Sequence, residues 1–68
     1  MTLSLYIVRI SIELQENLEE FLSESGIRYH RYDINVVDTI MYEIQTSEEI
    51  FTLMTLKFPF IGKSRWHR

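Results

Sequence analysis

The sequence predicts an α+β fold in which two helices cover one face of a small antiparallel sheet. Three observations favour it: an N-terminal run dense in β-branched and aromatic residues, two stretches in which apolar residues recur with helical spacing, and two strand-like segments joined by turn residues. A chain of 68 residues is long enough for one small hydrophobic core, so a single domain is expected.

The first predicted strand runs from Leu3 to Ile10. It is dense in Leu, Ile, Val and Tyr without helical spacing, so it is apolar on both faces and is expected to lie in the centre of the sheet. A helix follows, which Ser11 can cap and which is expected to end near Ser25, because Gly26 suits a left-handed C-cap. The buried stripe of this helix is predicted to be Leu14, Leu18, Phe21 and Leu22. Its opposite, solvated side carries Glu13, Glu16, Glu20 and Glu24.

The next segment predicts a β-hairpin. Residues between Ile27 and Ile34 are rich in β-branched and aromatic side chains, which indicates a second strand with imperfect alternation. Asn35 to Asp38 supplies turn chemistry, and Thr39 to Thr46 then alternates cleanly. One face of this third strand is expected to carry Ile40, Tyr42 and Ile44, and the other Met41, Glu43 and Gln45.

A second helix is expected to begin at one of two adjacent caps. Thr46 together with Glu49 fits a capping box, and Ser47 is the alternative cap. The buried stripe of this helix is predicted to be Ile50, Phe51, Leu53, Met54 and Phe58.

The C-terminal end is expected to add little to the sheet. Pro59 ends the second helix, so Phe60 and Ile61 can form only a stub of a last strand. We therefore expect one α+β domain at residues 1–61 and a basic C-terminal tail at residues 62–68.

The predicted order of strand, helix, two strands, helix and short final strand is that of the ferredoxin-like split βαβ arrangement. The rival is a thioredoxin-like arrangement, in which Val36 to Leu56 is mostly helical and Phe58-Pro59 is a proline turn. Against the rival, the cap at Ser47 falls within that supposed helix, and the pattern from Thr39 to Ile44 favours a strand. The predicted core consists of Leu14, Leu18, Phe21, Leu22, Ile40, Tyr42, Ile44, Phe51 and Met54.

The chain has no cysteine, which excludes disulfides, thiol catalysis and thiolate metal sites. A core in this size range rarely supplies more than about 3–5 kcal/mol, so self-association is one expected supplement. The absence of Ala beside nine Ile is typical of AT-rich genomes, such as those of many phages and some bacteria, with chance in a short strand-rich chain as the alternative.

No membrane segment is expected. The longest apolar stretch begins at Leu3 and is interrupted by Arg9, far short of the about 20 residues that cross a bilayer. Met1 to Ile12 lacks the basic start and the small-residue cleavage site of a secretory signal. We therefore expect a cytoplasmic protein, or one in a host cytoplasm.

No motif predicts a catalytic residue, a metal or a cofactor. Gly62-Lys63-Ser64 resembles the end of a phosphate loop, but Lys57 stands where that loop requires a glycine. His30 and Asp33 are three residues apart on a predicted strand, so alternation sends them to opposite faces. Acid–base or nucleophilic chemistry would depend on Asp, Glu, Ser and Tyr alone, and we expect a protein that is not an enzyme.

The first strand carries a resemblance to a known family. Leu5-Tyr6-Ile7-Val8-Arg9-Ile10 is similar to the first-strand motif of RNA-recognition domains, which implies that Tyr6 stacks on a base. The aromatic third-strand motif of that family, which opens with a basic residue and a glycine, is missing from Thr39 to Thr46. Binding of RNA or single-stranded nucleic acid by the sheet and the basic tail is therefore the alternative function. Its expected contacts are Tyr6, Arg28, Arg31, Lys63, Arg65, Trp66 and Arg68.

Charge is distributed unevenly along the chain. Ser11 to Ser25 holds five Glu and no base, whereas Phe51 to Arg68 holds four bases and no acid. A net charge of −3 disfavours nucleic acid as the main partner. The preferred function is a small interaction module that regulates or inhibits a larger macromolecular partner by binding it. An acidic ridge of Glu13, Glu16, Glu20 and Glu24 would dock a basic protein partner.

The sequence also predicts a homodimer. In the ferredoxin-like order the first strand lies between the third and the fourth, and a fourth strand limited to Phe60 and Ile61 leaves much of it unpaired. An open apolar edge favours pairing with a second copy, unless the tail from Gly62 folds back along the first strand. The expected dimer edge is Leu5, Tyr6, Ile7, Val8 and Ile10.

Overall fold

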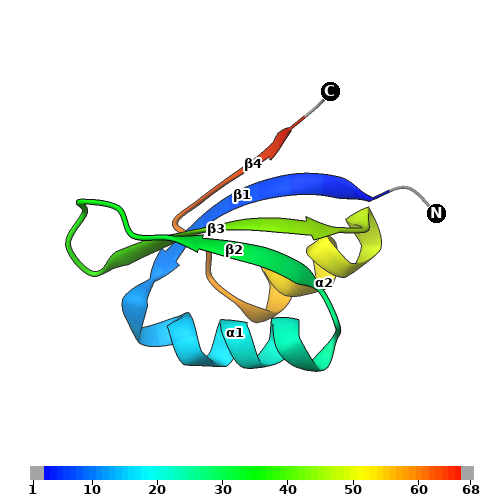
Figure 1. Ribbon diagram of the computed structural model, residues 1–68, viewed down its shortest axis with the longest axis horizontal. Helices are drawn as coiled ribbons and strands as arrows, with labels where there is room; N and C mark the ends of the chain where they lie inside the picture. The colour runs from blue at the N-terminus through cyan, green and yellow to red at the C-terminus, as the bar shows by residue number, and fades with distance from the viewer. Residues whose placement is uncertain (1–2, 67–68) are drawn as a thin grey trace.

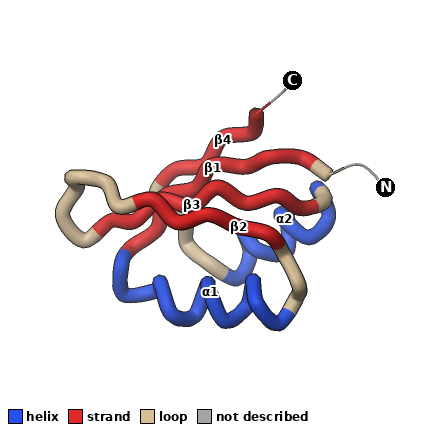
Figure 2. The backbone as a smooth tube through the Cα atoms, in the orientation of Figure 1, coloured by secondary structure: helices blue, strands red, loops and turns tan. Residues whose placement is uncertain are grey.

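The computed structural model describes residues 3–66, in which two helices pack on one face of a four-stranded antiparallel sheet (Figure 1, Figure 2). In chain order the elements are β1 (Ser4–Ser11), the short 3-10 helix η1 (Ile12–Leu14), α1 (Gln15–Glu24), β2 (Arg28–Tyr32), β3 (Thr39–Thr46), α2 (Glu48–Lys57) and β4 (Gly62–Trp66). The predicted α+β class is confirmed. None of the helices in this range is long and apolar enough to cross a membrane.

Strand β1 lies in the interior of the sheet, whose strand order is β2-β3-β1-β4. It pairs with β3 along its whole length, from Ser4 opposite Thr46 to Ser11 opposite Thr39. On its other side, β1 pairs with β4. The central position predicted for the first strand is therefore confirmed.

The last strand differs from the prediction. Phe60 and Ile61 form no strand, and the segment expected to be a basic tail forms β4, with Gly62 opposite Arg9. The amide of Ile61 donates to the carbonyl of Arg9 at 2.8 Å and leads the chain onto β1. Backbone groups of a strand need partners whatever the side chains of the neighbouring segment, so a polar composition does not prevent pairing. The domain extends to Trp66, and the boundary expected after residue 61 is wrong.

Helix α1 begins later than predicted and ends as predicted. Ser11 precedes η1, and α1 starts only at Gln15. At the other end Gly26 has a φ of 66°, and the amide of Ile27 donates to the carbonyl of Leu22 at 2.9 Å. This is the left-handed C-cap that a glycine allows without a steric penalty.

Helix α2 uses the second of its two candidate caps. The hydroxyl of Ser47 accepts a hydrogen bond from the amide of Ile50 at 3.4 Å. The helix ends at Lys57, because Phe58 is extended with φ −121° and ψ 130°. Extended backbone is the conformation that the following Pro59 favours for the residue before it.

The core lies between the sheet and the two helices. Its buried side chains are Val8, Ile10, Leu18, Leu22, Ile40, Tyr42, Ile44, Met54 and Phe58. Six of the nine predicted core residues belong to this cluster, and the other three, Leu14, Phe21 and Phe51, are partly buried against it. The pattern of apolar residues in the sequence therefore identified most of the core, including Phe58 in the predicted stripe of the second helix, and Val8 and Ile10 complete it. Leu53 of that predicted stripe is 61% exposed, so its predicted burial is wrong.

We expect Leu18→Ala to lower the free energy of unfolding by about 2–5 kcal/mol, because the Leu18 side chain is fully buried and its removal leaves a cavity. Leu56→Ala is the matched control. Leu56 is 81% exposed, so its truncation should change the free energy by less than about 0.5 kcal/mol. Urea denaturation of both variants measures the difference. A cooperative Leu18→Ala protein as stable as the wild type would contradict the packing of α1.

Candidate functional site

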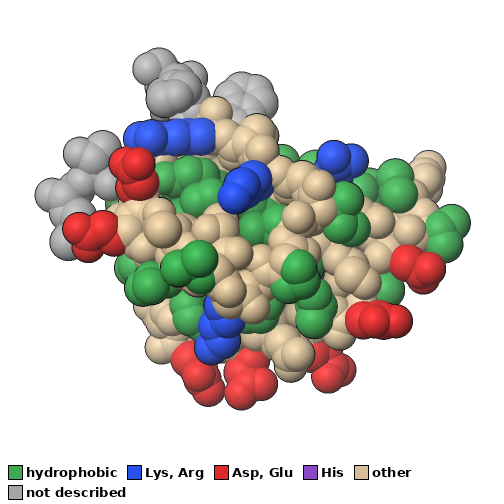
Figure 3. Space-filling model, turned by 180° about the vertical axis from the view of Figure 1, so that it is seen from behind, with side chains coloured by type: hydrophobic (Ala, Val, Ile, Leu, Met, Phe, Trp, Pro, Cys, Tyr) green, Lys and Arg blue, Asp and Glu red, His purple; other side chains and the backbone are tan. Residues whose placement is uncertain are grey.

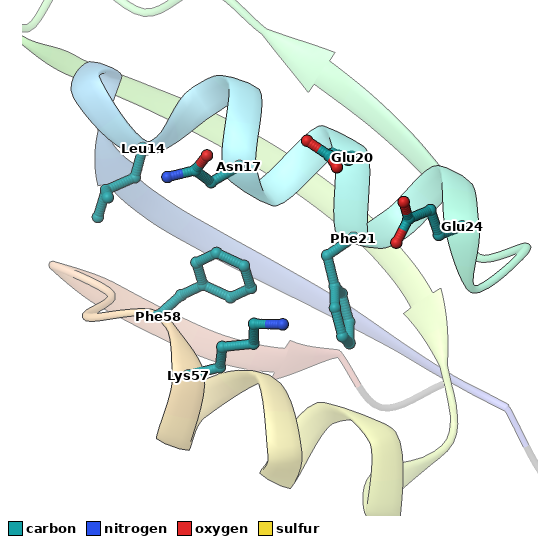
Figure 4. A pocket seen from close by; sticks show the side chains of 7 residues that line it. All are labelled: Leu14, Asn17, Glu20, Phe21, Glu24, Lys57 and Phe58. Atoms are coloured by element: carbon teal, nitrogen blue, oxygen red, sulfur yellow. The ribbon is translucent and has the colours of Figure 1, made fainter.

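A groove of about 340 Å³ lies between α1 and the C-terminal end of α2 (Figure 4). Its base is aromatic, because Phe21 from α1 and Phe58 from the end of α2 meet edge to face with ring centroids 5.8 Å apart. Leu14 adds apolar surface and Asn17 a polar group. This volume is at the lower end of the range of ligand sites, large enough for a few side chains of a peptide.

Lys57 places its own ammonium in this groove. Its Nζ atom lies 5.0 Å from the ring centroid of Phe21 and 6.0 Å from that of Phe58. These are cation–π distances, and Figure 4 shows the lysine side chain directed between the two rings. Within residues 3–66, no carboxylate forms an ion pair with Lys57. The rings therefore hold a cation without the help of a direct salt bridge.

Two members of the predicted acidic ridge reach the groove. Glu20 and Glu24 line it from α1, whereas Glu13 and Glu16 are exposed elsewhere on the same helical segment. Figure 3 shows acidic side chains along the lower edge, where α1 lies, with a basic side chain just above them, and further acidic groups at the upper left and at the right. The other basic side chains lie in the upper half, toward β4. The groove thus combines an aromatic base with a negative rim, which suits a cationic side chain carried on an apolar segment.

Glu19, a further glutamate of α1, has a role that the sequence reasoning missed. Its carboxylate accepts a hydrogen bond from the hydroxyl of Tyr42 at 2.6 Å and lies 3.3 Å from the guanidinium of Arg31. The hydroxyl of Tyr29 and the amide of Gln15 also donate to it, at 3.3 and 3.1 Å. Because Tyr42 is fully buried, this carboxylate supplies the partner that its hydroxyl needs. The available signal was the helical position of Glu19, at the border of the apolar stripe rather than opposite to it.

This cluster shifts two pKa values in opposite directions. The hydrogen bond from Tyr42 is the largest cause that lowers the pKa of Glu19 from its ordinary value of 4.5, and burial opposes it. Burial, followed by the Glu19 carboxylate, raises the pKa of Tyr42 above its ordinary value of 10.0. Both shifts keep Glu19 charged and Tyr42 neutral around pH 7, so the pair joins α1 to the sheet.

Tyr6 does not have the position that base stacking requires. Its side chain is 3% exposed, and its ring stacks on that of Phe51 with centroids 3.8 Å apart. Its buried hydroxyl has no hydrogen-bond partner within the described part of the chain. The stacking role implied by the resemblance to RNA-recognition domains is therefore wrong for Tyr6.

The basic residues expected to bind nucleic acid do not come together. Arg31 pairs with Glu19, and Arg65 lies 3.8 Å from the carboxylate of Glu48 at the start of α2. Both pairs tie a strand to a helix, on the helix side of the sheet. The remaining positions are Arg28 on β2 and Lys63 on β4, both exposed, Trp66 at the end of β4, and Arg68 outside the described residues.

Strand β1 does not provide a dimer edge. Its backbone pairs with β3 on one side and with β4 on the other, so the expected open edge at Leu5, Tyr6, Ile7, Val8 and Ile10 is wrong. The tail from Gly62 occupies the place expected for a second copy. Of the five side chains, Tyr6, Val8 and Ile10 are buried against the helices, and Leu5 and Ile7 are half-buried on the other face.

The residues considered as candidates for catalysis, phosphate binding or metal binding have ordinary structural positions. His30 packs edge-on against Tyr32, with ring centroids 4.5 Å apart. Gly62-Lys63-Ser64 lies in β4 and not in a loop before a helix. In residues 3–66, no three His, Asp or Glu side chains are grouped as metal ligands would be.

No protein-family model, curated protein or solved structure matches this chain. Its function is therefore inferred from the chemistry of its surfaces.

We expect Glu19→Gln to flatten the loss of stability in acid. Because the pKa of Glu19 is lower in the folded than in the unfolded state, its contribution is present above about pH 4.5 and is lost as the pH falls through the folded-state pKa. Urea unfolding between pH 7 and pH 3 should show a smaller decline for this variant than for the wild type. Glu16→Gln removes the same charge from an exposed position and should keep the wild-type decline. Equal declines in wild type and Glu19→Gln would refute the role of the cluster.

Proposed function

We propose that the chain is a small non-enzymatic interaction module that binds a larger macromolecular partner and thereby regulates or inhibits it. The binding site is the groove between α1 and α2, and its occupant is a basic protein segment that also carries an apolar side chain. The observation that supports this most directly is the ammonium of Lys57 lying over the rings of Phe21 and Phe58.

The groove attracts a cation for two physical reasons. The faces of its aromatic rings are electron-rich, and a cation over such a face gains about 0.5–1 kcal/mol at an exposed site. Glu20 and Glu24 add negative charge to the rim, and in the described chain neither forms an ion pair. Lys57 is exposed on a long, flexible stem, so a partner's lysine or arginine can displace it.

Inhibition follows from the kind of partner that such a groove selects. A chain of net charge −3 with five of its ten acidic residues between Glu13 and Glu24 is steered toward basic surfaces. Basic surfaces of large machines commonly contact nucleic acid. A small acidic module that covers one of them blocks that contact.

We also infer the ferredoxin-like split βαβ arrangement for this fold. Its support is that β1 lies between β3 and β4, that β3 lies between β2 and β1, and that every neighbouring pair is antiparallel.

The main argument for a homodimer was an open edge on β1, and β4 covers this edge. We therefore propose that a monomer meets the partner.

A fluorescence-anisotropy titration with a labelled amphipathic peptide of lysine and leucine tests the groove. The double variant Glu20→Lys/Glu24→Lys should bind about tenfold more weakly than the wild type, a difference of about 1.4 kcal/mol. Its stability should be unchanged, because exposed like charges on a helix contribute little to folding. Glu13→Lys/Glu16→Lys is the matched control: it changes net charge equally but does not alter the groove lining. Equal weakening by both double variants would show that only the overall charge attracts the peptide.

Lys57→Met should change the affinity for the peptide in the opposite direction. It removes the competing ammonium and keeps an apolar stem of similar length, so the same peptide should bind more tightly than to the wild type. Weaker binding would show that the peptide does not replace Lys57, and the groove would be rejected as the docking site.

A further inference from the structure

The face of the sheet that the helices leave open carries side chains in rows that follow the strand register. Running from β2 toward β4, the rows are Arg28, Gln45 and Leu5; His30, Glu43, Ile7 and Ser64; and Tyr32, Met41, Arg9 and Gly62. The half-buried side chains of Leu5, Ile7 and Met41 give this face an apolar surface, and the half-buried Glu43 lies beside Ile7 in the middle row. This face is on the other side of the sheet from the groove.

The charge of this face is opposite to that of the whole chain. The net charge of the chain is −3. Of its ten Asp and Glu residues, however, the register places only Glu43 on this face. The other acids lie in η1, α1, the first turn of α2 and the segment between β2 and β3. Arg9 and Arg28 therefore outnumber the acid on the open face.

Gly62 leaves room for the guanidinium of Arg9 beside the backbone of β4. A Cβ atom at residue 62 would lie only 2.5 Å from Nη2 and 2.9 Å from Nε of Arg9, so the guanidinium packs against the backbone of β4. The φ angle of Gly62 is not positive, so the glycine serves this close approach and not a special backbone conformation. No carboxylate in residues 3–66 pairs with Arg9. Its charge remains available to a ligand.

A shallow hollow lies next to this guanidinium. Its volume is about 220 Å³, and its lining includes Ile7, Met41 and Ser64 beside Arg9 and Gly62. In the same row as Arg9, Tyr32 is 37% exposed. Its ring lies edge-on against His30, and its hydroxyl donates to the carboxylate of Glu43 at 3.5 Å. A positioned cation, an apolar surface and an exposed ring thus occupy one side of the sheet.

We propose that this open face binds single-stranded nucleic acid. Arg9 and Arg28 contact phosphates, and an unpaired base lies against Tyr32 and the neighbouring apolar surface. Stacking on an aromatic ring combined with basic residues along the backbone is the general way in which proteins hold single strands. A duplex keeps the faces of its bases stacked inside, so it has no base face to place on Tyr32.

Two other occupants fit the face less well. An acidic peptide could pair with Arg9 and Arg28, but its carboxylates gain nothing from Tyr32, because the face of an aromatic ring is electron-rich. A second copy would place two positively charged faces against each other, which like charges oppose. The combination of ring and arginine therefore favours a nucleic acid.

Anisotropy of a labelled six-nucleotide oligo(dT) at low salt tests the proposal. Contacts with two phosphates predict a slope of about −1.4 for log affinity against log salt, so affinity should fall about sevenfold between 50 and 200 mM salt. Arg9→Gln should weaken binding and reduce this salt effect to about threefold. Tyr32→Leu should weaken binding with the salt effect unchanged, because it removes stacking and no phosphate contact.

Gly62→Ala separates the position of Arg9 from its charge. The added methyl group displaces the guanidinium without changing the net charge, so binding should weaken although the protein remains folded. Arg65→Gln is the control for Arg9→Gln, because it removes the same charge from the helix side of the sheet, and it should bind like the wild type. Glu43→Gln removes the acid of the open face and should bind more tightly.

Several results would overturn the proposal. Absence of binding at 50 mM salt, or equal losses for Arg65→Gln and Arg9→Gln, would leave no defined site on this face. A polyglutamate peptide that binds with the same dependence on Arg9 and Tyr32 would make it a carboxylate site. A dimer in sedimentation that Ile7→Lys dissociates would assign the face to a second copy. Thermal unfolding of each variant verifies that the compared proteins are folded.

Discussion

The pairing of β1 on both sides is the constraint on which the rest of the structure depends. A chain of 68 residues without cysteine has only backbone pairing and one small core to hold its sheet. Because successive side chains of a strand point to opposite faces, this pairing directs Val8 and Ile10 into the core and Arg9 to the open face. It also sets Gly62 opposite Arg9, so one register determines both the packing of the helices and the surface behind them.

The acidic residues of α1 divide into a structural and an exposed group. The carboxylate of Glu19 contacts Tyr42, Tyr29, Arg31 and Gln15. The pKa of Glu19 is lowered and that of Tyr42 is raised, so both pKa values move away from pH 7. A general acid or base works best with a pKa near the working pH, so these shifts suit a link between helix and sheet better than proton transfer. Glu20 and Glu24 remain exposed beside the aromatic groove, where their charge acts on whatever approaches.

The features that the sequence predicted correctly depend on neighbouring residues. The alternation from Thr39 to Thr46 and the glycine cap at Gly26 are local patterns, and both appear in the structure. Strand β4 has no such pattern, because it is an edge strand held by backbone hydrogen bonds to a distant segment. The contact of Glu19 with Tyr42 spans 23 residues, and the packing of Arg9 on Gly62 joins two neighbouring strands from opposite ends of the chain. Neither contact can be deduced from the spacing of residues along the chain. The sequence pattern therefore indicated Glu20 and Glu24 at the rim of the groove, but it did not indicate a role for Arg9 on the open face.

The two proposed surfaces differ in sign and lie on opposite sides of the sheet. The groove is built by side chains of the helices and is negative at its rim, whereas the open face is built by the strands and carries an excess of arginine. Packed layers of a protein are separated by about 10 Å, which is comparable with the distance of about 8 Å over which physiological salt screens a charge. Each surface therefore attracts its ligand largely through its own charges. The net charge of −3 is an average over both surfaces and describes neither, so a partner has to be inferred from each face separately.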